Sequence, residues 1–456
     1  MTKSRAATPT TVPTNCELGA RLFQSVERPT FRRIQTIGRL ADELGGEAYL
    51  VGGCVRDLLL GRTVLDLDVV MEGDALALVE RAREKLGAKA RVYAAFQTAT
   101  LSFPDHHKID IATARRESYA ASGHLPKVEP APLPEDLRRR DFTVNAMALR
   151  LKPRHLGELV DEVGGMDDLR RGVIRILHDA SFEDDPTRIL RAIRYKARLG
   201  FSPDSRTRAL MREAIRDHYL ERVSGHRLMT ELRRTLDEDD PMPALNLMIR
   251  RGVHRAYHAD LAVAKPTPTQ ARRMHDAIAW WTGEGAALSR KSAPKGDDET
   301  FHRWECWWYL LLSNFDHLCA DQLMARLEIS AKHSRRAHER LAEMHQAQLE
   351  LRYSCRRTGS NIHAHLEHLP VEAALALMAK TSSPGLVHAV QTHLTTLRHL
   401  RPALRGQDLL EMGVPRGKAL GKMQRAVLEE LRDRTYAGEG FRKAAQMRFA
   451  RTHFES

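Results

Sequence analysis

The residues with the clearest chemical meaning lie in one stretch, LVGGCVRDLLLGRTVLDLD, which covers residues 50–68. An apolar approach ends in Gly52-Gly53, and two carboxylates, Asp66 and Asp68, follow on a second extended segment. Side chains two positions apart on a strand point to the same face. Paired carboxylates suit Mg²⁺, which prefers oxygen ligands and leaves positions for phosphates, and paired glycines let backbone N–H groups approach a triphosphate closely. The combination predicts nucleotidyl transfer.

A third carboxylate belongs to a later predicted strand. Asp110 lies in KIDIATARRESY and could complete the acidic set. In two-metal phosphoryl chemistry the ions lie about 3.5–4 Å apart, one activating the attacking oxygen and the other neutralising the leaving phosphate. A D-x-D pair alone is common on exposed strand faces. The interpretation therefore depends on the glycine pair and on Arg56-Asp57 upstream.

The segment LRRRDFTVNAMAL, residues 137–149, places three arginines before Asp141 and Asn145. Arginine forks match the oxygens of a triphosphate. Asp141 offers acceptors and Asn145 an amide, which together suit a ribose edge. The alternative is a basic surface turn in which Asp141 caps a helix.

The segment FEDDPTRILRAIRY, residues 182–195, places Asp185 and Arg188 one helical turn apart. Cytosine and adenine both show an amino donor beside a ring-nitrogen acceptor, so a carboxylate and a guanidinium could read either base. Uracil and guanine present the opposite polarity and would leave buried charges unpaired. The alternative is a helix start with an i,i+3 salt bridge.

A fourth segment, LRGQDLLEMGVPRGKALGKMQRAVLEEL, covers residues 404–431. Glycines spaced four apart can bring backbone amides up to phosphates, and neighbouring cations add charge. Asp408 is a plausible N-cap, and the alternative is a hinge between two helices. The predicted RNA-binding residues are Gly413, Arg416, Gly417, Lys418, Gly421 and Lys422.

The composition of the 456-residue chain favours a polyanionic partner, because the net charge is +13 and the pI about 9.7. Residues 331–456 hold 21 Lys and Arg against 12 Asp and Glu, so most of the excess lies there. Five scattered cysteines fit a reducing cytoplasm and argue against a disulfide or zinc framework. No apolar run approaches a membrane span, and polar residues 1–15 lack the core of a secretory signal.

Helix and strand patterns alternate in the first third of the chain. Residues 31–46 predict a helix, residues 48–53 a strand, and a second helix begins near Asp74. Residues 91–103 and 107–114 predict strands, so we expect an α/β head. From about residue 167 the pattern is helical. We expect a disordered tail over 1–30, a head over 31–177, a neck over 178–236, a helical body over 237–400 and a helical tail over 401–456.

Taken in order, these four segments resemble the bacterial and eukaryotic (class II) tRNA nucleotidyltransferase and poly(A) polymerase family. The resemblance is dense over residues 49–236 and looser over 404–431. DDPTR resembles the family's E-D-x-x-R template, with Asp184 where Glu is usual, and ERVSGHRLMTEL resembles its neck helix. The implied fold is seahorse-like, with a polymerase-β-like head on a mixed sheet, followed by an all-α neck, body and tail.

The resemblance also implies roles for individual residues. Mg²⁺ would be the cofactor, ATP and CTP the substrates, and tRNA, held at its acceptor stem and elbow, the partner. The primer 3′-hydroxyl would attack the α-phosphate and pyrophosphate would leave. The implied sites are Asp66 and Asp68 for Mg²⁺, with Asp110 as a third catalytic carboxylate; Gly52, Gly53, Arg56 and Arg140 for phosphates; Asp141 and Asn145 for ribose; and Asp185, Arg188 and Arg191 for the incoming nucleotide.

Members of this family differ in product. CC-only members are marked by loss of a flexible loop between the first two motifs, and ESYAASGHLPKVEPAPLPEDL fills that space here without evident shortening. We therefore expect CCA addition, with A-only addition as the second alternative and poly(A) synthesis as the third. A non-enzymatic alternative is an RNA-binding protein on an inactive polymerase scaffold, which would need a broken metal pair.

Overall fold

The protein divides into two compact units. The first comprises Met1–Arg227 with Arg251–Ala256, and the second Leu228–Arg250 with Tyr257–Ser456. The boundary falls inside helix α10 (Gly225–Leu236), within the expected neck. The further division into head, neck, body and tail stays a prediction. This computed structural model describes residues 15–64, 66–118, 122–124, 126–292, 300–353 and 357–455.

A seven-stranded mixed sheet forms the centre of the first unit, with strand order β3-β4-β5-β2-β1-β8-β9. Strands β2 and β5 pair in parallel, whereas β1 pairs antiparallel with both β2 and β8. Apolar residues of β1 and β2 face the core, as the sequence pattern predicts. The strands are β1 (Glu47–Val51), β2 (Leu67–Glu72), β3 (Lys89–Tyr93), β4 (Thr98–Ser102), β5 (Lys108–Thr113), β8 (Ala148–Arg150) and β9 (Leu159–Val160).

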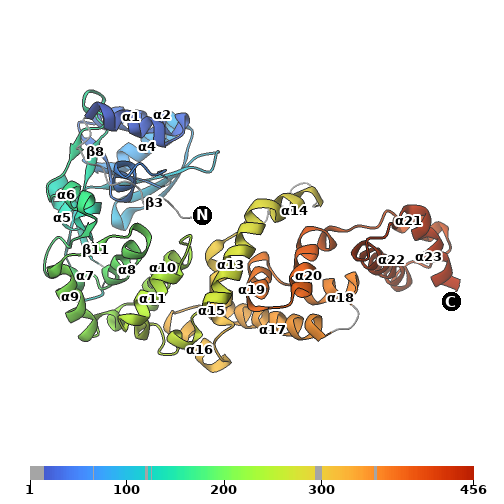
Figure 1. The fold of residues 1–456 in the computed structure, drawn as a ribbon. Helices are drawn as coiled ribbons and strands as arrows, with labels where there is room; N and C mark the ends of the chain where they lie inside the picture. Colours follow the sequence, from blue (N-terminus) through green and yellow to red (C-terminus); the bar gives the residue numbers. More distant parts are fainter. Residues whose placement is uncertain are drawn as a thin grey trace. The chain divides into compact units, whose positions relative to one another are not determined.

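Helices α2 (Arg28–Glu43) and α4 (Ala75–Leu86) pack against this sheet, and α1 (Asn15–Ser25) packs against α2 (Figure 1). Asp74 caps α4, accepting hydrogen bonds from the N–H groups of Leu76 and Ala77, which confirms the predicted helix start. The expectation of a disordered segment over residues 1–30 differs from the structure. The Leu18 and Leu22 side chains of α1 are buried, while residues 1–14 lie outside the described part.

The remaining elements of the first unit follow the sheet strands or join them. Helix α3 leaves the end of β1, and the hairpin β6–β7 follows β5. Short strands β10 and β11 pair in parallel beside the helices. These elements are α3 (Gly53–Leu59), β6 (Arg115–Ser118), β7 (Lys127–Pro130), α5 (Leu133–Arg138), α6 (Gly165–Arg171), β10 (Val173–Ile174), α7 (Ser181–Asp184), α8 (Thr187–Leu199), β11 (Ser202–Pro203) and α9 (Ser205–Arg216).

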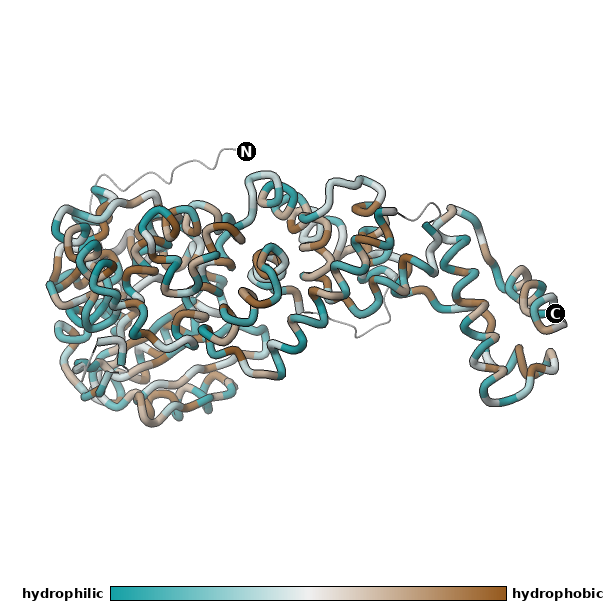
Figure 2. Tube along the Cα trace, turned by 90° about the horizontal axis from the view of Figure 1, so that it is seen from below, coloured by the Kyte–Doolittle hydropathy of each residue, from teal (hydrophilic) through white to brown (hydrophobic). Residues whose placement is uncertain are grey.

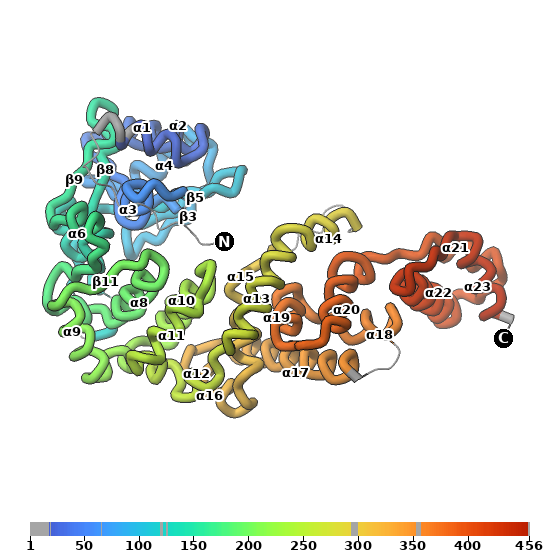
Figure 3. Tube along the Cα trace, viewed as in Figure 1, coloured from blue at the N-terminus to red at the C-terminus, as the bar shows by residue number. Residues whose placement is uncertain are grey.

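The second unit is helical in its described residues, as the sequence predicts. Helices α13 and α15 both pack against α19, whose residues 371–379 are buried (Figure 3). Its helices before the C-terminal segment are α11 (Met242–Arg250), α12 (Leu261–Ala264), α13 (Pro268–Trp280), α14 (Ala286–Ser292), α15 (Arg303–Leu312), α16 (His317–Arg326), α17 (Ala331–Tyr353), α18 (Gly359–Leu366), α19 (Val371–Lys380) and α20 (Pro384–Thr395).

The C-terminal helices α21 (Gly406–Glu411), α22 (Lys418–Tyr436) and α23 (Lys443–Glu455) share a small apolar core. Leu409, Val427 and Ala450 supply one buried side chain from each helix. Hydrophobic and hydrophilic positions interleave along these helices in Figure 2, as amphipathic helices require. No helix in the part of the chain that the structure describes is both long and apolar enough to cross a membrane.

Candidate active site

The parallel pairing of β2 and β5 brings two of the predicted carboxylates together. Asp68 and Asp110 are register partners across these strands. Their backbone neighbours Leu67 and Ile109 are buried, whereas both aspartates are exposed, because side chains alternate between the faces of a sheet. Thr100 on β4 donates its hydroxyl to Asp110. The geometry thus places two acceptor side chains on one exposed face.

Electrostatic coupling shows which charged groups surround Asp68. Although its carboxylate is open to solvent, nearby protein atoms hinder its hydration and raise the pKa of Asp68. Arg140 and Arg191 lower that pKa, while the carboxylates of Asp110 and Asp66 raise it. Asp66 lies just before β2 and is also exposed. Asp68 and Asp110 are thus adjacent on one face, Asp66, Arg140 and Arg191 act on Asp68 electrostatically, and carboxylate oxygens are the ligands that a divalent cation such as Mg²⁺ prefers.

The glycine pair forms the turn from β1 into α3. Gly52 has φ +79°, a conformation that side-chain-bearing residues rarely adopt, and it precedes the first residue of the helix. A Cβ atom on Gly52 would also lie 3.1 Å from Nη1 of Arg140. A Cβ atom on Gly53, by contrast, would lie at an ordinary contact distance from the guanidinium of Arg56. The turn therefore requires glycine at position 52 and lets Arg140 approach the backbone.

Arg56 is placed differently from the expectation that it faces the triphosphate. Its guanidinium is 3% exposed and bonds both oxygens of Asp57, at 2.9 Å each. Its Nη1 donates to Oδ1 of Asn145 at 2.6 Å, and the group lies over the ring of Tyr195. In this state Arg56 fastens α3 to the Asn145 segment rather than presenting donors to solvent.

A residue that the sequence reasoning missed holds the arginine run. Asp136 is fully buried and accepts hydrogen bonds from Arg139 at 2.6 Å and from Arg140 at 2.8 Å. Burial alone would raise the pKa of Asp136, but these two guanidinium groups hold it below its ordinary value. The i, i+3 and i, i+4 spacing in PEDLRRR was a usable signal for this arrangement. Asp136 thereby orients Arg140 beside Asp68.

Asp141 and Asn145 form one connected network. The amide of Asn145 donates to Oδ1 of Asp141 at 2.9 Å, and Nε of Arg191 donates to Oδ2 at 2.7 Å. Burial would raise the pKa of Asp141, but Arg191 and the hydrogen bonds keep it below the ordinary value. Arg191 also reaches the hydroxyl of Tyr195 at 3.0 Å. The predicted ribose residues and Arg191 therefore come together.

Asp185 and Arg188 do not pair with each other. Asp185 ends α7 in an extended conformation, so helical spacing does not apply to it. Arg188 is 4% exposed and donates to Oγ of Ser181 at 2.6 Å and to the carbonyl of Arg139 at 2.7 Å. The i,i+3 salt bridge named as the alternative is thus absent between these two described residues, and reading a base would require Arg188 to change partners.

A second missed residue, Arg227, engages Asp185. Its Nη2 donates to Oδ1 of Asp185 at 2.7 Å, and its Nη1 donates to the carbonyl of Gly123 at 3.1 Å. Thr187 donates to the same Oδ1 from its N–H and from its hydroxyl. Arg227 lies in the segment predicted as a neck helix, but its spacing gave no sign of this partner 42 residues earlier.

The predicted RNA-binding residues gather where α21 meets α22. Gly413 and Gly417 have positive φ values of +90° and +93°, which permits the turn. Asp408 is not the N-cap that we expected, because it accepts from the N–H of Arg405 three residues earlier and from Lys443. All six predicted residues are exposed: Gly413, Arg416, Gly417, Lys418, Gly421 and Lys422.

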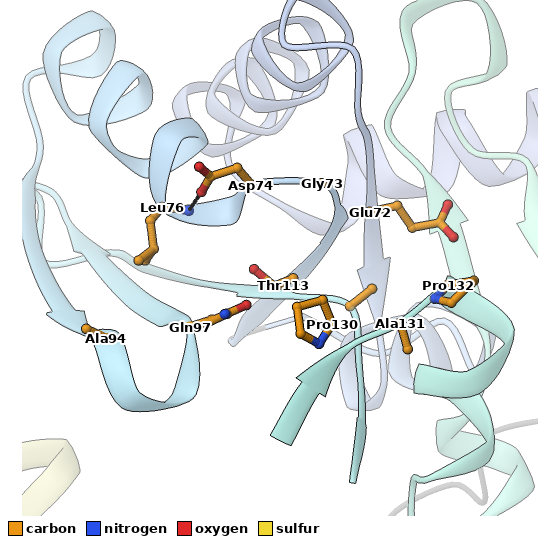
Figure 4. A pocket seen from close by; sticks show the side chains of 11 residues that line it. Glu72, Gly73, Asp74, Leu76, Ala94, Gln97, Thr113, Pro130, Ala131 and Pro132 are labelled. Atoms are coloured by element: carbon orange, nitrogen blue, oxygen red, sulfur yellow. Dashed lines mark hydrogen bonds between the residues drawn. The ribbon is translucent and has the colours of Figure 1, made fainter. Parts of the chain in front are cut away.

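A cavity of about 800 Å³ in the first unit is separate from this constellation. Figure 4 shows Glu72, Asp74, Gln97 and Thr113 around it. It opens at the C-terminal end of β2, whereas Asp68 lies near the N-terminal end of that strand. Four residues of strand span roughly 13 Å, so this cavity does not coincide with the carboxylate cluster.

Two family models match the chain. The "Poly A polymerase head domain" matches residues 48–175, which contain the carboxylates and the arginine run. The "Probable RNA and SrmB- binding site of polymerase A" matches residues 200–263.

Among relatives, the A-adding tRNA nucleotidyltransferase of Geobacter sulfurreducens is 34% identical over 429 residues, covering 93% of this chain and 47% of the relative. This chain thus spans about half of that protein. The A-adding enzyme of Halalkalibacterium halodurans is 32% identical over 386 residues, covering 84% of this chain and 83% of the relative. The CC-adding tRNA nucleotidyltransferase of Deinococcus radiodurans is 37% identical over 254 residues, covering 54% of this chain and 67% of the relative.

Solved structures of CCA-adding enzymes match nearly the whole chain. An apo form superposes with a TM-score of 0.66 at 30% identity, covering 95% of this chain and 97% of that chain. The Thermotoga maritima enzyme complexed with tRNA gives 0.62 at 28%, covering 96% and 98%. A complex with ATP gives 0.62 at 28%, covering 96% and 97%. The fold, the motifs and the Halalkalibacterium relative together identify this chain as a member of the tRNA nucleotidyltransferase and poly(A) polymerase family.

Proposed function

We propose that this protein adds the terminal AMP to the 3′ end of tRNA, with ATP as donor and Mg²⁺ as cofactor. The observation that carries the proposal is the pairing of Asp68 with Asp110 across β2 and β5, beside Arg140. Asp66, Asp68 and Asp110 would hold Mg²⁺, whose Lewis acidity would stabilise charge on the α-phosphate and on pyrophosphate.

The chain's own residues would position the nucleotide. Arg140 and Arg191 bring positive charge to the carboxylate face, where the phosphates would lie. Asp141 and Asn145, fixed in one network, would meet the ribose. The primer 3′-hydroxyl would then attack the α-phosphorus, and pyrophosphate would leave.

The Asp185 carboxylate would accept from the adenine amino group after releasing Arg227 or sharing it. Arg188 would donate to the adjacent ring nitrogen once it leaves Ser181. This exchange of partners would let one pair of side chains read A, and C by the same edge, while excluding U and G.

Two observations bear on whether the product is A-only or CCA addition: the names of the relatives and the length of the segment between β5 and α5. The Geobacter and Halalkalibacterium relatives are named A-adding enzymes, which favours A-only addition. The sequence between β5 and α5 is not shortened, which disfavours CC-only addition and is compatible with both A and CCA addition. CCA addition is therefore the second candidate, favoured by structural similarity to CCA-adding enzymes over nearly the whole chain.

The test uses three RNA primers: tRNA lacking its CCA end, tRNA ending in CC, and an unrelated RNA. Each is incubated with ATP, CTP or both, and products are separated at single-nucleotide resolution. Extension of only the CC-ended tRNA, by one AMP, is the expected result. Three-nucleotide extension of the first primer would establish CCA addition, and long A tracts on unrelated RNA would establish poly(A) synthesis.

The same assay tests the non-enzymatic alternative and the cation. An Asp68→Asn variant serves as the inactive control, and each reaction is repeated after chelation with Mg²⁺ or Ca²⁺ restored. Tight tRNA binding by the wild-type protein without any extension under these conditions would favour an RNA-binding role on an inactive scaffold.

A further inference from the structure

A group of metal-ligand side chains lies in the second unit, far along the sequence from the nucleotide motifs. His258 and Asp260 lie between the short helix η5 (Val253–Ala256) and α12, and Cys319 lies in the first turn of α16. One donor atom from each residue lies within 4.8 Å of the other two. The Cys319 thiol contacts Oδ2 of Asp260 at 3.2 Å, and Nδ1 of His258 lies 3.9 Å from that oxygen.

Two hydrogen bonds fix the tautomer of the His258 imidazole. Its Nε2 lies 2.9 Å from Oε1 of Gln322, an acceptor, so Nε2 carries the proton. Its Nδ1 bears the lone pair, which accepts the backbone N–H of Asp260 at 3.1 Å, so a metal ion bound at Nδ1 would replace this hydrogen bond. The ring of Phe315 contacts the imidazole edge-on at a centroid distance of 5.6 Å. A partner on the far nitrogen is the usual support for a metal-binding histidine.

We propose that His258, Asp260 and Cys319 bind a zinc ion that fastens the start of α16 to the turn before α12. Tetrahedral zinc, with bonds of about 2.0–2.3 Å, holds its ligand atoms about 3.3–3.7 Å apart. The thiol–carboxylate and imidazole–carboxylate distances are already near that range. Side-chain shifts of about 1 Å would complete the site, with water as a fourth ligand.

The ligand types favour zinc over the cation of the nucleotide site. A thiolate and an imidazole select zinc, whereas magnesium prefers oxygen alone. Asp316 adds negative charge, since its carboxylate accepts the N–H of Cys319 at 2.8 Å. The Asp260 side chain is 56% exposed, which leaves an approach for the ion. The sequence argued against a zinc framework only because its cysteines lack C-x-x-C spacing, whereas the proposed site needs a single thiol.

A second group on the same helix gives a matched comparison. His317 and Asp321 of α16 and His338 of α17 also bring donor atoms within 4.8 Å. Here both imidazoles contact the Asp321 carboxylate, and their rings stack at 4.1 Å. Stacked, nearly parallel rings cannot both aim a lone pair at one ion, and the group lacks a thiol. We therefore assign the zinc to Cys319.

The experiment treats the full-length protein with a chelator, removes the chelator and titrates Zn²⁺ or Co²⁺ by calorimetry and absorption. We expect one tight equivalent of Zn²⁺, a raised melting temperature, and thiolate-to-cobalt charge-transfer absorption in the near ultraviolet. Cys319→Ser and His258→Gln should each weaken Zn²⁺ binding at least about tenfold, and Cys319→Ser should abolish the absorption band.

His338→Gln is the control and should bind Zn²⁺ like the wild-type protein. Circular dichroism without metal should confirm that all variants fold. Absence of tight Zn²⁺ binding by the wild-type protein would overturn the proposal, as would cobalt spectra without thiolate absorption. Loss of binding only in His338→Gln would transfer the site to the second group. None of these outcomes depends on nucleotide addition, so the test stands apart from that of the proposed function.

Discussion

The carboxylate face of the first unit and the basic turn between α21 and α22 carry charge in opposite ways. Around Asp68 the nearby cations have internal partners: Arg140 bonds the buried Asp136, and Arg191 bonds Asp141. At the turn, Arg416, Lys418 and Lys422 are exposed. The first arrangement fixes positions, whereas the second supplies charge to a surface.

The two regions should therefore tolerate substitution differently. A guanidinium that a buried carboxylate holds in place has a fixed position. Removing one partner of such a pair should therefore disturb the positions of several neighbouring side chains together. Exposed cations act through the field that they add, so their effects should accumulate gradually and fall with salt.

Asp68→Asn should lower the rate of nucleotide addition by at least about 10³-fold, because one lost metal ligand removes several kcal/mol of transition-state stabilisation. The affinity for tRNA should change by less than about twofold. Single-turnover rates with saturating tRNA and filter binding measure the two effects. Glu84→Ala, a change at an exposed position of α4, is the control. Near-normal turnover of Asp68→Asn with Mg²⁺ would refute the carboxylate assignment.

Asp136→Asn should lower the free energy of unfolding by about 3 kcal/mol, because it leaves two largely buried guanidinium groups without their shared carboxylate. Catalysis should fall as well, since Arg140 loses its orientation. Denaturant unfolding followed by fluorescence measures the first effect. Arg138→Ala, at an exposed neighbour on the same helix, should cost less than about 0.5 kcal/mol. Equal stability of the two variants would contradict the conclusion that Asp136 holds Arg139 and Arg140 in position.

Arg188→Ala should raise incorporation of UTP or GTP relative to ATP by about tenfold or more, because one charge-assisted hydrogen bond to the base is lost. Competition assays with paired nucleotides measure this ratio. Ser181→Ala removes only the hydroxyl that holds Arg188 at rest and should leave the ratio unchanged. A uniform loss of rate with unchanged selectivity would show that Arg188 is structural.

Replacing Arg416, Lys418 and Lys422 together with alanine should weaken tRNA binding without slowing chemistry at saturating tRNA. Each lost phosphate contact lowers the slope of log K against log salt by about 0.7–0.9, so the slope should fall by about 2–3. Binding titrations at several salt concentrations measure it. Replacing the exposed Lys85 and Lys89 of the first unit is the control. An unchanged slope in the triple variant would place the RNA contacts elsewhere.

The smallest expected effect concerns a buried histidine in the second unit. Burial lowers the pKa of His393 well below its ordinary value, and His363, Arg398 and Arg432 lower it further. The unfolded chain therefore binds this proton first. Stability is full above about pH 6.5 and falls as the pH drops below that value. Melting temperatures at pH 7.5 and 5.5 should show this loss, and His393→Gln should reduce it. An equal loss in the variant would assign the pH dependence to other groups.

Alternation and glycine spacing are local signals, so the sequence allowed the strand that bears Asp68 and the Gly52 turn to be predicted, but Asp66 lies before β2 and the same-face partner of Asp68 is Asp110 on β5. Partners distant in sequence could not be predicted this way: Arg56 meets Asn145, 89 residues later, and Arg227 meets Asp185. Asp136 was missed although its helical spacing was visible. The alternative interpretation of Asp185 and Arg188, an i,i+3 salt bridge, is wrong because the chain is extended at Asp185 and the Arg188 guanidinium bonds Ser181 and Arg139 instead.

Helix α1 has a practical consequence for anyone who shortens this protein. Its buried Leu18 and Leu22 pack next to α2 and α3, and Phe23 meets Phe31 edge-on. Helix α3 in turn begins at the Gly52 turn. Deleting all residues before residue 30 would remove α1 and expose the apolar surface of α3, the helix that begins at the Gly52 turn of the candidate active site. A shortened form of the protein should therefore keep α1.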